Sequence, residues 1–125
     1  MKILLVDDSR ATRSMIRRML ARLDAEVLEA ENGVNALQVL AAHGAVDAVL
    51  VDWNMPVMTG IDFVREVRKQ PAYERMPIMM VTTETGIEQL QSAVEAGANE
   101  YLMKPFTEIM LLEKLQLLGL CEIVE

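Results

Sequence analysis

Three aspartates, a threonine and a lysine directly follow short apolar segments of the sequence. Asp7 and Asp8 follow the first segment, Asp52 follows the third, Thr82 the fourth and Lys104 the fifth. A carboxylate can act as a nucleophile and form an aspartyl phosphate. Lysine, hydroxyl groups and a metal ion can offset the charge that a phosphoryl group carries. Gathered in one place, these residue types would suit phosphoryl transfer to an aspartate.

The acidic residues of this set also predict a metal ion. Three neighbouring carboxylates repel each other and raise one another's pKa unless a cation joins them. Oxygen ligands suit a hard cation, and a shallow site that leaves waters in place suits Mg²⁺ better than Ca²⁺. Zinc is not expected, because the chain has one cysteine, Cys121, and one histidine, His43.

The elements that must position these residues follow from the hydrophobic pattern. Apolar runs that predict strands alternate with segments of helical period. The runs are Ile3–Val6, Val27–Glu29, Ala48–Val51, Ile78–Val81 and Tyr101–Met103, and the helical segments lie near 9–23, 33–43, 60–69, 87–96 and 107–118. This alternation predicts an α/β fold, with a doubly wound parallel sheet between two layers of helices. Ligands of such sheets collect at the carboxyl ends of the strands, where the residues above are expected to meet.

Length and composition narrow the function classes. The 125 residues suit one domain, and 52% hydrophobic with 25% charged residues is typical of a folded globular protein. A net charge of −7 disfavours direct binding to nucleic acid. No apolar run reaches the roughly 18 residues that insertion into a membrane requires. The single cysteine cannot form an internal disulfide, and we expect a cytoplasmic protein.

The positive charge is concentrated near the N-terminus. The first 23 residues carry six Lys/Arg and two Asp, and five arginines recur there at helical spacing: Arg10, Arg13, Arg17, Arg18 and Arg22. Such a face is either simply solvated or docks an acidic partner, and the sequence leaves both interpretations open.

Five motifs carry a resemblance to a known family over essentially the whole chain. They are VDDS at 6–9, VDWNMPVMTG at 51–60, VTTE at 81–84, AGANEYLMKPF at 96–106 and LEKL at 112–115. The chain resembles a response-regulator receiver domain, and within that family the CheY-like single-domain chemotaxis regulators. The resemblance implies one receiver domain over residues 1–125, with a flavodoxin-like sheet of strand order 2-1-3-4-5 and five helices. It also implies two-component signal transduction, with phosphorylation by a histidine kinase or phosphotransfer protein.

The resemblance assigns the metal site residue by residue. It implies that Asp52 is the phosphoacceptor and that Asp8 and Asp52 ligate Mg²⁺ directly. Asp7 would act largely through water, and the backbone carbonyl of Asn54 would be a further ligand.

The remaining roles concern the phosphoryl group and the response to it. Thr82 and Lys104 are expected to contact the phosphoryl oxygens, and Tyr101 to change orientation when Thr82 moves. Asn54 and Glu84 are expected to tune dephosphorylation. The resemblance thus implies a switch that catalyses its own phosphorylation and dephosphorylation, and not an enzyme acting on other substrates.

The output partner is not identified by the sequence. The resemblance implies a downstream protein bound through the fourth helix, fifth strand and fifth helix, and a homodimer through this surface is also open. Ser9 replaces a bulkier aromatic of the best-known chemotaxis regulators, and residues 85–88 lack the basic residues that those proteins use near their motor-binding surface. A flagellar motor is therefore not assumed as the target.

The last helical segment has more apolar residues than one face can hold. We expect Ile109, Leu112 and Leu115 to face the sheet. Met110, Leu111, Leu117 and Leu118 would then need other cover, either from a partner or from the tail at 120–124.

Two other proteins would share much of this pattern. A receiver cut from the N-terminus of a multidomain regulator would look the same. A small aspartyl-phosphate phosphatase is disfavoured, because such enzymes need an acid two residues after the nucleophile, where this chain has Asn54.

Overall fold

The computed structural model of the protein describes residues 1–121 and contains one five-stranded parallel sheet. The strand order is β2-β1-β3-β4-β5, which confirms the order implied by the resemblance. Every residue of β3 and β4 is buried, as expected of central strands that are covered on both faces. The strands are β1 (Lys2–Val6), β2 (Glu26–Ala30), β3 (Ala48–Val51), β4 (Ile78–Thr82) and β5 (Glu100–Met103).

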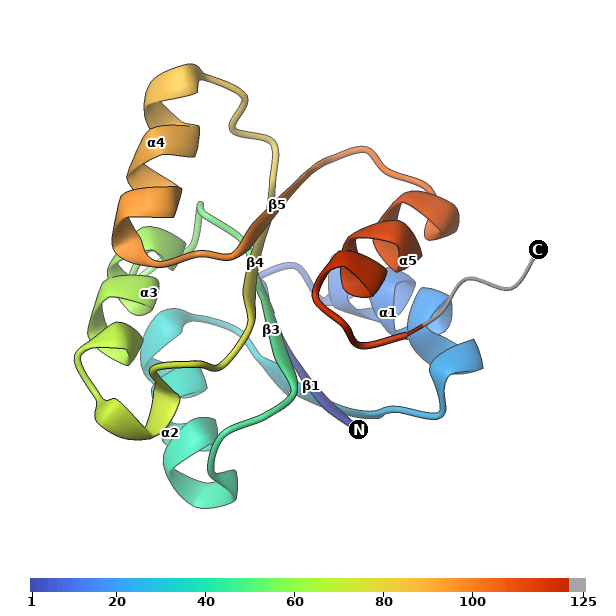
Figure 1. Cartoon of the computed structure of the whole chain (residues 1–125), viewed down its shortest axis with the longest axis horizontal. Coiled ribbons are helices and arrows are strands. Elements are labelled where there is room, and N and C mark those ends of the chain that lie inside the picture. The colour runs from blue at the N-terminus through green and yellow to red at the C-terminus, as the bar shows by residue number, and fades with distance from the viewer. Residues whose placement is uncertain (122–125) are drawn as a thin grey trace.

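Five α-helices cover the sheet in two layers, with α2, α3 and α4 on one face and α1 and α5 on the other (Figure 1). Alternate residues of β4 pack against the two helix layers. Ile78 and Met80 pack on the side of α2, α3 and α4, and Met79 and Val81 pack on the side of α1 and α5. The helices are α1 (Arg10–Met19), α2 (Gly33–His43), α3 (Gly60–Arg68), α4 (Ile87–Ala96) and α5 (Glu108–Leu117), and two short 3₁₀ helices are η1 (Leu20–Leu23) and η2 (Pro71–Tyr73). No helix within residues 1–121 is both long and apolar enough to cross a membrane.

Four of the five helices begin at a side chain that caps their first turn. The capping residues are Ser9, Asn32, Thr59 and Thr107, each accepting a hydrogen bond from the backbone N–H three residues later. Helix α4 starts instead at Gly86, without a side-chain cap. Ser9 thus has a local structural role as the cap of α1.

The first helical segment is shorter than predicted. Its α-helix ends at Met19, and the chain continues as the 3₁₀ helix η1 up to Asp24, which has a left-handed backbone (φ 52°). Leu20 and Leu23 still pack into the same core layer, so the apolar periodicity alone did not reveal the change of helix type.

The orientation of α5 differs from the prediction. Leu111, Leu112 and Leu115 are buried, whereas Ile109 is 49% exposed. Leu111 was expected to need other cover and Ile109 to face the sheet, and both expectations were wrong. Leu111, Leu115 and Leu118 recur about one helical turn apart and pack on the core. Ile109 therefore lies on the outer side of the helix.

The segment after α5 provides part of the extra cover. Leu120 and Cys121 pack against the core layer of α1 and α5, and the Cys121 thiol lies 3.6 Å from the carbonyl of Leu112. Met110 and Leu117 remain exposed. The rest of the predicted cover, residues 122–124, lies outside the described residues.

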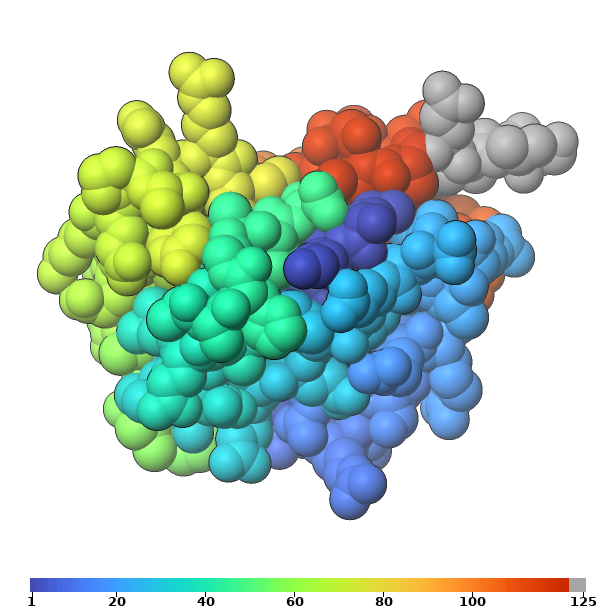
Figure 2. Space-filling model, turned by 90° about the horizontal axis from the view of Figure 1, so that it is seen from below, coloured from blue at the N-terminus to red at the C-terminus, as the bar shows by residue number. Residues whose placement is uncertain are grey.

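Figure 2 shows the molecule from below, at the edge of the sheet where the strands begin. There the N-terminal residues (dark blue) lie between the segment leading into β3 (green) and that leading into β2 (lighter blue). Backbone hydrogen bonds from Asp47 N to Lys2 O and from Glu26 N to Met1 O hold these segments together. The polar residues singled out in the sequence belong to the other edge.

Candidate phosphoacceptor site

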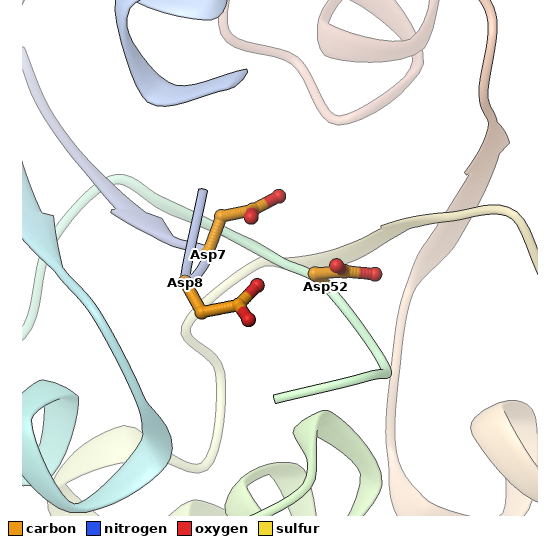
Figure 3. Close-up of side chains that lie close together, drawn as sticks. All are labelled: Asp7, Asp8 and Asp52. Carbon is orange, nitrogen blue, oxygen red and sulfur yellow. The ribbon is translucent and has the colours of Figure 1, made fainter. Parts of the chain in front are cut away.

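Asp7, Asp8 and Asp52 meet at the carboxyl ends of β1 and β3, where their side chains lie next to one another (Figure 3). One carboxylate oxygen of each lies within 4.8 Å of the others. The two strands are direct neighbours in the sheet, and their register pairs Val6 with Val51, so the residues that follow them emerge side by side. Asp7 and Asp52 are buried, whereas Asp8 is exposed and provides the open side of the cluster.

Lys104 extends into this cluster from the end of β5. Its Nζ lies 2.9 Å from Asp7 Oδ2 and 3.4 Å from Asp52 Oδ2, and its side chain is 19% exposed. The Lys104–Pro105 peptide bond is cis. The ammonium group therefore stands next to both buried carboxylates, as the sequence predicted.

The electrostatics of Asp52 favour a cation. Burial raises the pKa of its carboxyl group, the charge and hydrogen bond of Lys104 and the hydrogen bond of Thr82 lower it, and the charge of Asp7 raises it further. The pKa ends above its ordinary value, so one lysine does not fully offset the cost of holding these charges together. An oxygen-ligated cation at the cluster would supply the missing positive charge.

The loop after Asp52 lies directly on the site. A Cβ atom at Gly60 would come within 2.0 Å of the Asp52 carbonyl oxygen, so a side chain there would displace the loop. Within the loop, Met58 N donates to Pro56 O at 2.8 Å, which closes a γ-turn around Val57 at φ 71°. This backbone is strained for a β-branched residue. Neither position could be assigned a role from the sequence, although Gly60 at the end of the VDWNMPVMTG motif was a usable signal.

Arg13 is a site residue that the sequence analysis missed. It was treated as part of a surface face, but its side chain is only 14% exposed. Nη1 donates to the backbone carbonyl of Asp7, and Nε donates to Glu29 Oε1 at 2.9 Å. Arg13 therefore holds the chain at the end of β1 in position.

Other arginines of α1 and η1 are also paired. Arg17 Nη2 lies 3.0 Å from Glu29 Oε2, and Arg22 Nη2 lies 3.2 Å from Glu108 Oε2. Burial raises the pKa of Glu29, but the hydrogen bonds and charges of the two arginines outweigh it, so that this pKa lies below its ordinary value. Only part of the predicted basic face is thus available to a partner.

The predicted switch and tuning residues share one set of contacts. Thr82 is fully buried at the end of β4, and its Oγ1 accepts from Glu84 N at 3.3 Å. The Asn54 amide donates to Glu84 Oε1 at 3.0 Å, and the Tyr101 hydroxyl donates to the Glu84 backbone carbonyl at 2.6 Å. The site is therefore linked through Glu84 to β5.

Comparisons with known proteins agree with this fold. Residues 3–116 match the response regulator receiver domain family, and the chain belongs to this family, whose CheY-like members are signalling switches. It is 48% identical over 117 residues to a chemotaxis protein CheY homologue of Campylobacter jejuni, covering 93% of this chain and 90% of that protein.

Solved structures of related proteins are similar to this chain as well. Chemotaxis protein CheY4 of Vibrio cholerae superposes with a TM-score of 0.87 at 42% identity, over 94% of this chain and 97% of that one. The receiver domain of a Pseudomonas aeruginosa sensor histidine kinase has a TM-score of 0.83 at 32% identity, over 94% of this chain and 97% of that one, and has a magnesium ion coordinated in its active-site cleft. The chain is thus similar throughout to regulators of two-component chemotaxis signalling.

Proposed function

We propose that the protein is a phosphorylation switch in which Asp52 accepts a phosphoryl group from a histidine kinase or phosphotransfer protein. The observation that carries this proposal is the convergence of Asp7, Asp8 and Asp52 with the Lys104 ammonium group. A structural role alone does not account for these carboxylates, because burial, and in addition the charge of Asp7, raises the pKa of Asp52.

The residues present fit a Mg²⁺ ion. Asp8 and Asp52 would hold it directly, Asp7 largely through water, and the backbone carbonyl of Asn54 would complete the protein ligands. The magnesium ion in the active-site cleft of the Pseudomonas receiver domain supports a metal ion at this place in the fold. A bound Mg²⁺ would supply positive charge that offsets the charge of the phosphoryl oxygens.

The side chains of the site have separate tasks in the transfer. An Asp52 carboxylate oxygen forms the bond to phosphorus, while the bond between phosphorus and the histidine nitrogen of the donor breaks and its electron pair stays on that nitrogen. Lys104 keeps its proton and donates to a phosphoryl oxygen. Thr82, whose Oγ1 now accepts from Glu84 N, donates its hydroxyl to another and is drawn toward the phosphoryl group.

Movement of Thr82 would change the surface to which the downstream partner binds. Space that Thr82 vacates can be filled by Tyr101, which lies on the neighbouring strand and now donates to the Glu84 carbonyl. Turning Tyr101 inward breaks that bond and reshapes the face formed by α4, β5 and α5, through which a downstream partner would bind. Moving such an equilibrium from 1:99 to 99:1 takes about 5.5 kcal/mol. Hydrogen bonds to a charged group contribute about 1.5–3 kcal/mol each, so about two to four such bonds would supply this free energy.

NMR with beryllofluoride and Mg²⁺, a mimic of the aspartyl phosphate, tests this function. We expect resonance shifts at Asp52, at Tyr101 and along α4. Thr82→Ala should keep the shifts near Asp52 and lose those at Tyr101, whereas Thr82→Ser, which retains the hydroxyl, should keep both. Shifts confined to the pocket in the unmodified protein would contradict the proposed output.

A further inference from the structure

Asp7 is held by a hydrogen-bond donor at each of its three oxygen atoms. Oδ1 accepts from the backbone N–H of Ser9 at 2.8 Å, and Oδ2 accepts from Lys104 Nζ at 2.9 Å. The backbone carbonyl oxygen accepts from Arg13 Nη1. The side chain of Asp7 is only 6% exposed. Asp7 therefore has a fixed position at the end of β1, and both of its carboxylate oxygens already have a donor.

Asp8 differs from its neighbour in being exposed, although the two carboxylates lie next to each other (Figure 3). The carbonyl group that Arg13 binds belongs to the peptide unit between Asp7 and Asp8. A peptide unit is planar, so holding its oxygen atom also fixes the direction in which Asp8 leaves the strand. The position of the Asp8 carboxylate therefore depends on the contact that Arg13 makes with the backbone.

Arg13 is itself fixed by the neighbouring strand β2. Its Nε donates to Glu29 Oε1 at 2.9 Å, and its side chain is 14% exposed. The planar guanidinium group thus joins two acceptors, the Glu29 carboxylate and the Asp7 carbonyl group. Arginine presents its donors in a rigid fork, which the ammonium group of a lysine does not reproduce. The contact consequently depends on the shape of the arginine as well as on its charge.

Arg17 provides an internal comparison one turn further along α1. Its Nη2 lies 3.0 Å from Glu29 Oε2 and donates to the backbone carbonyl of Val27 at 3.1 Å. Its side chain is 51% exposed. Arg13 and Arg17 therefore share a helix, a charge and a carboxylate partner, but Arg17 contacts β2 where Arg13 contacts the acid pair.

We infer that Arg13 is a positioning residue of the metal site, whose hydrogen bond to the Asp7 carbonyl holds the Asp8 carboxylate in place for Mg²⁺. The inference rests on the proposed function, which assigns Mg²⁺ to Asp8 and Asp52, and it adds a residue of α1 that sets the affinity of the site. Groups that orient metal ligands without touching the metal commonly contribute about 10- to 100-fold to metal affinity.

The contact of Arg13 also differs from that of Lys104 in how it responds to phosphorylation. Lys104 is proposed to donate to a phosphoryl oxygen, so its contact with Asp7 changes during the transfer. The backbone N–H of Ser9 and the guanidinium group of Arg13 have no such second task. These two donors keep the acid pair in place while the phosphoryl group arrives.

Titration with Mg²⁺ alone tests the inference. Trp53 is the only tryptophan of the chain and directly follows Asp52, so its fluorescence reports on the site, and calorimetry checks the same constants. We expect Arg13→Ala to bind Mg²⁺ about tenfold more weakly than the unmodified protein. Exposed ion pairs contribute little, so Arg17→Ala should change the affinity by no more than about twofold.

Two further variants separate the geometry of the contact from its charge. Arg13→Lys keeps a positive charge beside Glu29 but loses the fork, and its affinity for Mg²⁺ should stay close to that of Arg13→Ala. Glu29→Gln removes the charge of the pair but leaves Arg13 at the Asp7 carbonyl, and it should bind Mg²⁺ like the unmodified protein. Thermal unfolding in a chelator shows which variants are folded at the titration temperature. Arg13→Lys carries the comparison if Arg13→Ala is not.

The rate of labelling by acetyl phosphate gives a second readout. Arg13→Ala should need about tenfold more Mg²⁺ for half-maximal rate and should reach the maximal rate of the unmodified protein when Mg²⁺ is saturating. A small phosphodonor does not dock on α1, so an effect on the binding of a protein donor is excluded. A lower maximal rate with an unchanged requirement for Mg²⁺ would show that Arg13 does not act through the metal site, and would overturn the inference.

The titrations can overturn it as well. Unchanged Mg²⁺ affinity of Arg13→Ala, full affinity of Arg13→Lys, or an equal loss in Arg17→Ala would each do so. Absence of Mg²⁺ binding to the unmodified protein would have the same consequence.

The result distinguishes this inference from the proposed function, because Mg²⁺ binding is measured without a phosphodonor. Binding that depends on Arg13, with no label on Asp52, would support the positioning role and contradict the proposed function. Label on Asp52 that requires Mg²⁺, with unchanged Mg²⁺ binding by Arg13→Ala, would do the reverse.

Discussion

The side chains of Asn54 and Glu84 are joined by a hydrogen bond of 3.0 Å from Nδ2 to Oε1. The two residues are 30 positions apart and come from the loops that follow β3 and β4, next to the candidate phosphoacceptor. The same Glu84 accepts the Tyr101 hydroxyl at its backbone carbonyl. One residue therefore connects the surroundings of the site to the strand that is proposed to transmit its state.

We predict that Asn54 and Glu84 act as a unit on the lifetime of the aspartyl phosphate. Each alanine variant should change the dephosphorylation rate, and the double variant should change it no further. The coupling should be at least about 0.5 kcal/mol, as is usual for residues in contact. Rates are followed on the pre-phosphorylated protein after removal of the donor. Strictly additive effects would show that the hydrogen bond has no role in tuning.

Asp52→Asn is expected to stabilise the metal-free protein at neutral pH. The raised pKa of Asp52 means that the folded state binds its proton more readily than the unfolded state, so the charged form destabilises the fold above the folded pKa. This loss of stability develops as the pH rises from the pKa of Asp52 in the unfolded state, about 3.9, through its pKa in the folded state. Thermal unfolding in a chelator should show a higher melting temperature for Asp52→Asn at pH 7.

The pH series contains its own control. The advantage of Asp52→Asn should disappear as pH falls toward the unfolded pKa, where Asp52 is protonated in both states. An advantage of Asp52→Asn that persists unchanged at low pH would mean that the buried charge of Asp52 is not its cause.

Val57→Gly is expected to stabilise the protein by about 1 kcal/mol, because glycine adopts a positive φ without the strain that a β-branched residue stores there. Val57 has φ 71° and is 81% exposed, so the substitution removes little packing. Urea unfolding measures the difference. Val94→Gly, an exposed valine within a helix, should instead destabilise the protein. Destabilisation by Val57→Gly would mean that the valine side chain has a packing role.

The strands and the acidic cluster could be predicted from the sequence because both depend on local patterns. Fully apolar runs predicted β3 and β4, and residues that follow adjacent parallel strands must emerge at the same edge. The topology therefore places Asp7 and Asp52 side by side and Lys104 at the same edge two strands from β3, from where its long side chain reaches both carboxylates.

The features that were missed depend on tertiary contacts. The role of Arg13 follows from its distance to the Asp7 carbonyl, which no helical spacing reveals. The buried side of α5 is set by how the helix lies on the sheet, and a helix apolar on several sides gives no periodic signal to choose between Ile109 and Leu111. The left-handed backbone at Val57 was hidden because valine rarely adopts it.

The most direct test of phosphorylation at Asp52 is intact-mass measurement after incubation with acetyl phosphate and Mg²⁺. We expect the mass of one phosphoryl group to be added, the label to be lost in base, and peptide mapping to place it on Asp52. Omission of Mg²⁺, or Asp52→Asn, should abolish the label, while Asp62→Asn should retain it. Full labelling of Asp52→Asn at the wild-type rate would contradict the central role of this residue.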